Sequence, residues 1–210
     1  MSINLDDEYL KKLEKYVGKK LEIFKEENEI KFYADWEMHY ILEEKDNIYS
    51  FYKVERGKRS KLAEYFSEKK MKQRLAINIK GLFGEKIDYS KPKEFNNIKN
   101  LEDGKKLIAV YIEPEYYSIM NPEAMKINLE KEKEKYHIYF LNDSNEKQYL
   151  EKNIDVSFAF SRLYNEARYL KRFFNKIKEY EVIFDDKIEE ERLYGLIIHN
   201  IWWLFWSFYI

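Results

Sequence analysis

Apolar residues near the amino terminus recur every three or four positions, which predicts an amphipathic helix. This helix spans about 5–17, with Asn4 as a possible cap and Gly18 as a natural stop. Its apolar side chains are Leu5, Tyr9, Leu13, Tyr16 and Val17. The polar positions between them point the other way, so one face of the helix is expected to pack on a core.

The pattern then changes to alternating apolar and polar residues, which predicts strands. Five strands are expected, separated by short charged turns, at 19–24, 30–36, 38–44, 48–55 and 61–66. In 30–36, Ile30 and Phe32 share a face with Ala34 and Trp36. This favours an antiparallel meander with one face in water, followed by a helix between Ser67 and Gly84.

The second half of the chain repeats parts of the first. GKKLEIF at 18–24 resembles GKKLIAV at 104–110, and MHYILEEKDNIYSFY at 38–52 aligns with MKINLEKEKEKYHIY at 125–139. Each copy leads into a long helix, which in the second copy spans 154–180. We therefore predict an α+β fold of two tandem duplicated modules, each an antiparallel β meander packed by a helix.

Three parts of the chain follow from this alignment. The first α+β module is expected at 1–92 and the second at 93–185, with a polar linker at 85–100. A hydrophobic carboxyl-terminal helix is expected at 186–210.

The last eighteen residues, 193–210, contain no charged side chain and three of the four tryptophans. A membrane-spanning helix needs about 20 apolar residues, and this segment also holds His199 and Asn200. The preceding segment, 185–192, is acidic, which is the wrong sign for a cytoplasmic flank. We expect the segment to be buried against the modules or at a partner contact, with a membrane-anchored adaptor as the alternative.

Composition narrows the function classes. Lys and Arg number 38 and Asp and Glu number 39, so the net charge of −1 gives no general attraction to nucleic acid. Cysteine is absent, which excludes disulfides and thiolate zinc sites. The amino terminus has no apolar signal core, so we expect a cytoplasmic protein.

No catalytic signature is found in the sequence. It has neither a glycine-rich phosphate loop nor a G-x-S-x-G elbow. His39, His137 and His199 are far apart and show no metal-ligand spacing. We therefore expect no enzyme activity, no metal and no cofactor.

One basic stretch keeps an RNA-binding alternative open. KVERGKRSK at 53–61 places five cations on a predicted hairpin, close to Tyr49, Phe51 and Tyr52. Basic turns beside aromatic rings can follow single-stranded RNA. The corresponding stretch of the second copy, LNDSNEKQ, is not basic, so nucleic acid is not the favoured partner.

The segment LAEYFSEKKMKQRLAINIKGLFG at 62–84 carries a family resemblance. In this segment a strand leads into a helix whose last residues are a hydrophobic residue followed by Phe83 and Gly84. This arrangement resembles the small α+β immunity proteins of bacterial polymorphic toxin and contact-dependent inhibition systems. Ala63 stands where the family pattern has glycine, and Glu68 is the one acidic residue at the helix start. The resemblance implies a cytoplasmic, non-enzymatic inhibitor that binds a cognate toxin domain, often a nuclease, and blocks its active site.

Two acidic segments with aromatic residues are the expected partner-binding sites. Acidic groups speed capture of a basic partner, and aromatic side chains anchor interfaces. The residues are Asp35, Trp36 and Glu37 in the first module and Glu113, Glu115, Tyr116 and Tyr117 in the second. For Trp36 the alternative is a place in the strand core.

Overall fold

The computed structural model describes residues 3, 5–34, 37–84 and 90–188, and it has an α+β fold. The chain divides into two compact units. The first unit contains the residues up to 84 together with Lys176–Ile188, and the second contains 90–175. The division thus falls within the helix that the sequence assigned wholly to the second module.

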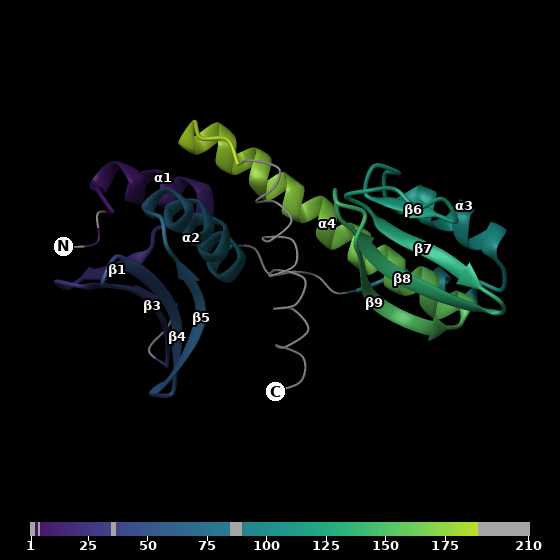
Figure 1. The fold of residues 1–210 in the computed structure, drawn as a ribbon, viewed down its shortest axis with the longest axis horizontal. Helices are drawn as coiled ribbons and strands as arrows, with labels where there is room; N and C mark the ends of the chain where they lie inside the picture. The colour runs from purple at the N-terminus through teal and green to yellow at the C-terminus, as the bar shows by residue number, and fades with distance from the viewer. Residues whose placement is uncertain (1–2, 4, 35–36, 85–89, 189–210) are drawn as a thin grey trace. The chain divides into compact units, whose positions relative to one another are not determined.

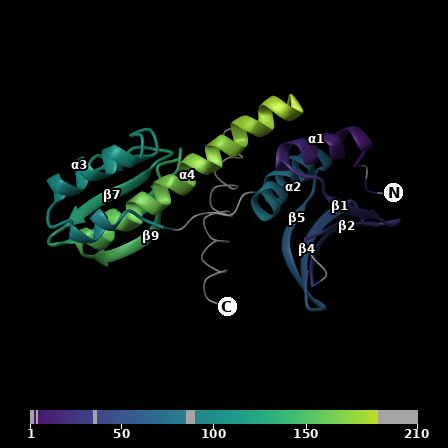
Figure 2. The ribbon, with the colours of Figure 1, turned by 180° about the vertical axis from the view of Figure 1, so that it is seen from behind.

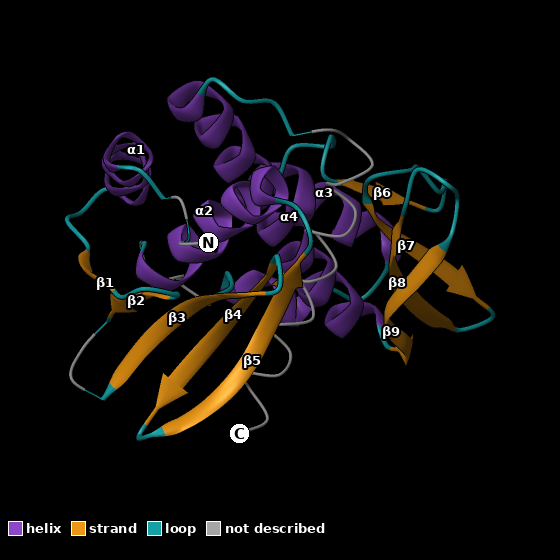
Figure 3. Ribbon diagram, turned by 60° about the vertical axis from the view of Figure 1, so that its left-hand side comes forward, coloured by secondary structure: helices purple, strands orange, loops and turns teal. Residues whose placement is uncertain are grey.

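The first unit is an antiparallel sheet with two helices, α1 (Asp7–Val17) and α2 (Glu68–Phe83). The strands lie side by side in chain order (Figure 3), as the meander prediction requires. They are β1 (Glu22–Lys25), β2 (Glu29–Tyr33), β3 (Met38–Lys45), β4 (Ile48–Glu55) and β5 (Lys58–Tyr65).

The ends of α1 show how local chemistry sets its length. The Asp6 carboxylate accepts the backbone N–H of Tyr9 at 2.7 Å, so Asp6 is the amino-terminal cap. The prediction of Asn4 as the cap is therefore wrong, and Asn4 itself lies outside the described residues. Gly18 ends the helix as predicted, with a φ of +83° that glycine adopts without steric cost.

The helices pack on one face of this sheet (Figure 1). The Tyr40 ring stacks on Phe51 at 5.8 Å and meets Phe83 of α2 edge-on at 5.5 Å. Residues from 176 onward complete this core: the Tyr16 hydroxyl donates to the Lys176 carbonyl at 2.9 Å. The carboxyl-terminal turns of a helix that begins at Val156 are therefore part of the core of the first unit.

The second unit contains a four-stranded sheet in the order β6-β7-β8-β9. Figures 1 and 2 show helix α4 on one face of this sheet. Its elements are η1 (Lys93–Asn97), α3 (Leu101–Tyr111), β6 (Tyr117–Ile119), β7 (Ile127–Glu132), β8 (Lys135–Leu141), β9 (Lys147–Ile154) and α4 (Val156–Phe184).

One strand departs from the predicted antiparallel meander, because β6 runs parallel to β7. The connecting loop turns back so that β7 starts beside the start of β6. The side chain of Asn128, which is 1% exposed, holds the loop by accepting the Glu123 N–H at 2.8 Å and donating to the Glu123 carbonyl at 3.0 Å. This buried side-chain contact within the fold has no signature in the alternation of the strands.

The alignment of 18–24 with 104–110 is not matched in secondary structure. Residues 18–24 run from the end of α1 into β1, whereas 104–110 lie within α3. The Asn100 side chain caps α3 by accepting the Asp103 N–H at 2.9 Å. This cap favours a helix over the strand that the alignment implies.

The second aligned block, in contrast, forms a two-stranded hairpin in both halves. Leu42 pairs with Phe51 in the β3–β4 hairpin, and Leu129 pairs with Ile138 in the β7–β8 hairpin. Both leucines are core residues, at 0% and 1% exposed. Residues that pair across the first hairpin therefore align with residues that pair across the second.

The long helix α4 begins at Val156, close to the predicted start at 154, and continues to Phe184, beyond the predicted end at 180. Apolar residues at helical spacing along α4 are buried, with Phe160, Leu163 and Ala167 at 0% exposed. The predicted linker is partly structured, because η1 places Phe95 in the core at 0% exposed. The burial of Phe95 was not predicted, because the surrounding segment is polar and charged.

The predicted carboxyl-terminal helix lies outside the described residues from 189 onward. None of the helices in the described part of the chain has both the length and the apolar character needed to cross a bilayer.

Candidate functional site

The five-stranded sheet has a second face, opposite to α1 and α2, which we call the outer face. Cross-strand partners lie on the same face of a sheet, so the register identifies its residues. Two rows of partners cross the strands. The first row is Phe24, Lys31, Ile41, Tyr52 and Lys61, and the second is Glu22, Tyr33, His39, Val54 and Arg59.

Three rings form an aromatic strip on the outer face. The Phe24 and Tyr33 ring centroids are 5.2 Å apart at 75°, and the Tyr33 and His39 rings stack at 4.8 Å and 22°. Phe24 is 51% exposed, although it is a large apolar side chain. The strip thus offers ring surface that a second protein can cover.

On the other side of the outer face, Arg59 contacts an aromatic ring and two carboxylates. Its guanidinium carbon lies 3.8 Å from the centre of the Tyr52 ring. Its nitrogens pair with Glu43 at 2.8 Å and with Glu29 at 3.4 Å. Glu29 and Glu43 are direct cross-strand partners, so Arg59 relieves the repulsion between two carboxylates while its own side chain is held in place.

The charge of His39 is set by its surroundings. Partial burial lowers the pKa of His39, and the positive charge of Lys31 lowers it further. The imidazole is therefore neutral at neutral pH. A neutral ring stacks on Tyr33 without a desolvated charge, which suits a surface that a partner covers.

The predicted partner-binding residues of the first module fall between β2 and β3 in sequence. Asp35 and Trp36 lie outside the described residues. Glu37 is held by Arg56, which donates its backbone N–H to the Glu37 carbonyl at 3.0 Å and its Nε to the Glu37 carboxylate at 3.4 Å. Their role in binding stays a prediction.

In the second unit, the predicted acidic residues are exposed whereas the predicted aromatic residues are buried. Lys171 bonds both carboxylate oxygens of Glu113, at 2.5 and 2.7 Å, and this lowers the pKa of Glu113. Tyr116 and Tyr117 are buried, at 5% and 8% exposed, and burial with the nearby Glu115 raises the pKa of Tyr116 to about 12. Glu113 and Glu115 are exposed, so these carboxylates are the part of the segment that a partner can reach.

The basic hairpin at 53–61 is largely neutralised by nearby carboxylates. Lys53 pairs with Glu55 at 2.8 Å, Lys61 pairs with Glu64, and Arg56 and Arg59 have the acidic partners described above. The turn itself consists of Arg56 and Gly57. These pairs offset the local positive charge on which the RNA-binding alternative depends.

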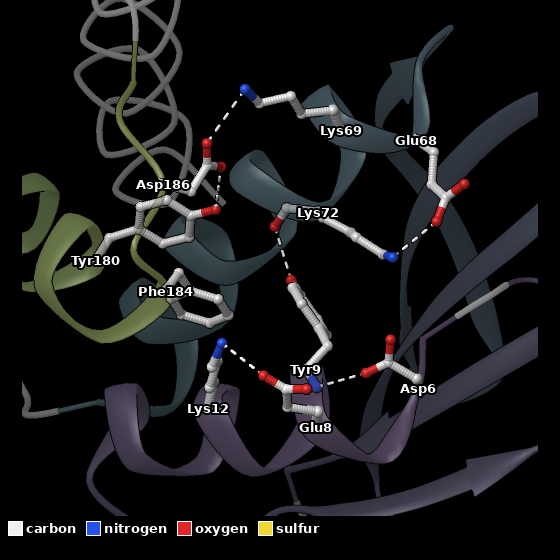
Figure 4. Close-up of a pocket in the computed structure, with 10 residues that line it drawn as sticks. All are labelled: Asp6, Glu8, Tyr9, Lys12, Glu68, Lys69, Lys72, Tyr180, Phe184 and Asp186. Carbon is white, nitrogen blue, oxygen red and sulfur yellow. Dashed lines mark hydrogen bonds and ion pairs between the residues drawn. The ribbon is translucent and has the colours of Figure 1, made fainter.

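A pocket of about 520 Å³ lies on the helical side of the first unit (Figure 4). Its aromatic lining consists of Tyr9 from α1 and Tyr180 and Phe184 from α4. Three ion pairs surround these rings, namely Glu8–Lys12 at 2.8 Å, Glu68–Lys72 at 2.7 Å and Lys69–Asp186 at 3.2 Å. Asp6 completes the set of charged residues.

The described residues contain no group of three or more side chains placed to hold a metal ion. His39 and His137 belong to different units, and His199 lies outside the described part of the chain.

The outer face was only partly visible in the sequence. Alternation in 30–36 placed Lys31 and Tyr33 opposite the core, but nothing local joins them to Phe24 or Arg59. Those two residues come from β1 and β5 and are aligned by the register of the sheet. Phe24, an aromatic residue that alternation places on the face opposite Ile23, was the one available signal.

Comparisons of this chain with protein-family models, with curated protein sequences and with solved structures find no match.

Proposed function

We propose that this protein is a cytoplasmic, non-enzymatic immunity protein that binds a cognate bacterial toxin domain and occludes its active site. The observation that carries the proposal is the outer face, where an exposed aromatic strip lies beside an arginine held over a tyrosine ring. The resemblance of 62–84 to immunity proteins supports the same function.

The composition of the outer face suits a protein interface. Tyrosine and arginine are enriched among the residues that dominate binding energy, and aromatic side chains are enriched at interfaces generally. Arg59 is already fixed by Tyr52 and two carboxylates, so a partner that meets it loses little side-chain entropy. The carboxylates on the same face disfavour a nucleic acid backbone as the partner.

The proposal includes a shared origin for the two halves. The β3–β4 and β7–β8 hairpins have the same register under one alignment, which supports descent from one ancestral hairpin. The flanking helices and β6 then belong to divergence after duplication. The second sheet also carries rings, since Tyr149 is 41% exposed and its ring centre lies 5.5 Å from that of Tyr139. We propose the toxin-binding role for the first unit because its sheet adds Arg59, held over Tyr52 by two carboxylates.

Acidic groups are proposed to speed the encounter with a basic toxin. Asp35 with Glu37, and Glu113 with Glu115, supply this charge. Reversing the charge of each pair to lysine is expected to lower the association rate at low salt, with little change at high salt. Stopped-flow kinetics at two salt concentrations measure this, and equal rates for both variants and the parent would contradict the steering role.

Growth rescue tests the function itself. The chain is co-expressed with the toxin domain encoded beside its own gene, and with an unrelated toxin as a control. Rescue from the adjacent toxin alone is expected. Growth arrest with both toxins would refute the immunity function, and rescue from both would refute cognate recognition.

A further inference from the structure

The pocket of Figure 4 presents ring faces with their hydroxyl groups already occupied. The Tyr9 hydroxyl donates to the Lys72 carbonyl at 2.7 Å, and the Tyr180 hydroxyl donates to Asp186 at 3.0 Å. Burial raises the pKa of both phenols, so they remain protonated donors. A molecule that enters the pocket therefore meets π surface and not a free hydroxyl.

The three rings that line the pocket also contact one another. Tyr180 stacks on Phe184 at 4.5 Å and 18°, and Phe184 meets Tyr9 at 5.3 Å and 50°. Phe184 is half-buried, whereas Tyr9 and Tyr180 are 7% and 2% exposed, so Phe184 has the most accessible ring of the three. Aromatic ring faces attract a cation within about 6 Å of a ring centre.

The charged residues around the rings leave one negative charge in excess. The lining contains four carboxylates and three lysines. Each lysine pairs with one carboxylate, and the fourth, Asp6, caps α1. Glu8 is the most accessible of the paired carboxylates, at 78% side-chain exposure, and exposed pairs of this kind are weak and exchange readily.

Asp186 is fixed as a negative charge at one side of the pocket. Burial alone would raise its pKa, but hydrogen bonds from Gln73, Lys69 and Tyr180 hold the pKa below its usual value. The Gln73 amide donates at 2.8 Å and is itself 2% exposed. The pocket thus combines a permanent carboxylate with aromatic walls.

The protein already places one ammonium group in these surroundings. Lys72 Nζ lies 5.8 Å from the centre of the Tyr9 ring and 2.7 Å from the Glu68 carboxylate. An ammonium held by a ring face and a carboxylate is the pair of contacts that a bound amine would make. Phe184 and Glu8, again a ring and a carboxylate, also line the pocket.

From these contacts we propose that the pocket is a binding site for a small organic cation, of the quaternary-ammonium or alkylamine class. Cation–π attraction to Tyr9 and Phe184 supplies the recognition, and Glu8 and Asp6 balance the charge. The site is independent of the proposed toxin binding, because it lies on the helical side of the sheet and shares no residue with the outer face.

The test compares choline with 3,3-dimethylbutan-1-ol, which has the same shape without the charge. Each is titrated into the full chain at constant ionic strength, and NMR shifts of ring protons are followed. We expect saturable choline binding and about tenfold weaker binding of the alcohol, which is the size of a cation–π contribution. Equal affinities, or no saturable binding of choline, would overturn the proposal.

Two variants and an anion distinguish the contacts. Phe184→Leu removes a ring face, and Glu8→Gln removes an exposed carboxylate; each is expected to weaken choline binding by about threefold or more. Phe158→Leu, at an exposed ring in the second unit, is the control and should bind as the parent does. Circular dichroism establishes that Phe184→Leu is folded, and Glu8→Gln decides the question if it is not.

Inorganic phosphate is the third probe. Tighter binding of phosphate than of choline would show that the three lysines dominate, and the proposal would then be wrong. Unchanged choline affinity in both variants would also contradict it. Neither result bears on growth rescue by the outer face, so the two proposals fail separately.

Discussion

The buried carboxyl group of Glu166 leads to a pH dependence of stability that is opposite in sign to the usual one for carboxylates. Glu166 lies on α4 and is 2% exposed, with Arg162 Nη2 at 3.2 Å from its carboxylate. Burial raises the pKa of Glu166 to about 7; Arg162 opposes this shift and the charge of Glu151 adds to it. The desolvation cost thus exceeds the attraction of the arginine.

The sign follows from proton binding in the two states. The pKa of Glu166 is about 7 in the folded chain and 4.5 for the unperturbed group, so between these values the folded state binds more protons. Stability is fully retained below about pH 4.5 and is lost as the pH rises through 7. At about 1.4 kcal/mol for each pKa unit, the complete loss is about 3 kcal/mol.

Glu166→Gln removes this titration and keeps a side-chain oxygen for Arg162. Urea unfolding of the parent and the variant, followed by circular dichroism at pH 5, 6, 7 and 8, measures the difference in unfolding free energy. The variant should gain about 2.5 kcal/mol relative to the parent between pH 5 and pH 8, because only the parent must ionise a buried carboxyl group over this range.

The control is Glu134→Gln, whose parent side chain is 92% exposed and should give a difference independent of pH. Parallel curves for Glu166→Gln and the parent would refute the reasoning. A variant that instead loses stability relative to the parent as the pH rises would show that the ionised pair with Arg162 outweighs burial.

Two other predictions concern packing and the carboxyl-terminal segment. Gly104→Ala should lower stability by about 1–3 kcal/mol in thermal unfolding, because the added Cβ would lie 2.1 Å from the Phe160 ring. Gly81→Ala should raise stability by up to about 1 kcal/mol, because its Cβ would meet only Lys176 Nζ at 3.6 Å. Equal effects of the two substitutions would contradict the packing argument. Removing 193–210 should lower the midpoint of thermal unfolding or cause aggregation, whereas a folded truncated chain beside a full chain that needs detergent would support the membrane-anchored alternative.

The alternation of residues predicted the first sheet well because each strand there has one buried face. Ile30 and Phe32 are 2% and 0% exposed, as their spacing requires. The prediction failed at 104–110, which resembles the strand segment 18–24 in sequence but forms a helix. GKKLIAV looks like a strand, yet the Asn100 cap and the packing of Gly104 on Phe160 belong to a helix.

Contacts distant in sequence account for what could not be predicted. The parallel placement of β6 depends on Asn128 holding a loop, and the core of the first unit depends on Tyr180, far from α1 in sequence. The outer face is similar, because Phe24 and Arg59 lie on opposite edge strands and share one face only through the register of five strands. Local patterns predict which face of a strand is buried, but they do not predict the register that places residues of distant strands on one face.

The most direct test of the proposed function is the affinity of the chain for the adjacent toxin domain. The double variant Phe24→Ala/Arg59→Ala removes the exposed ring of the strip and the arginine over Tyr52. Phe158→Ala is the matched control, because Phe158 and Phe24 are both 51% exposed.

Isothermal titration calorimetry measures the three dissociation constants. We expect the double variant to bind about 30-fold or more weakly than the parent, since a dominant interface residue contributes about 2 kcal/mol or more. The Phe158→Ala control should bind as the parent does. Parent-like affinity in the double variant would show that the outer face is not the toxin-binding surface.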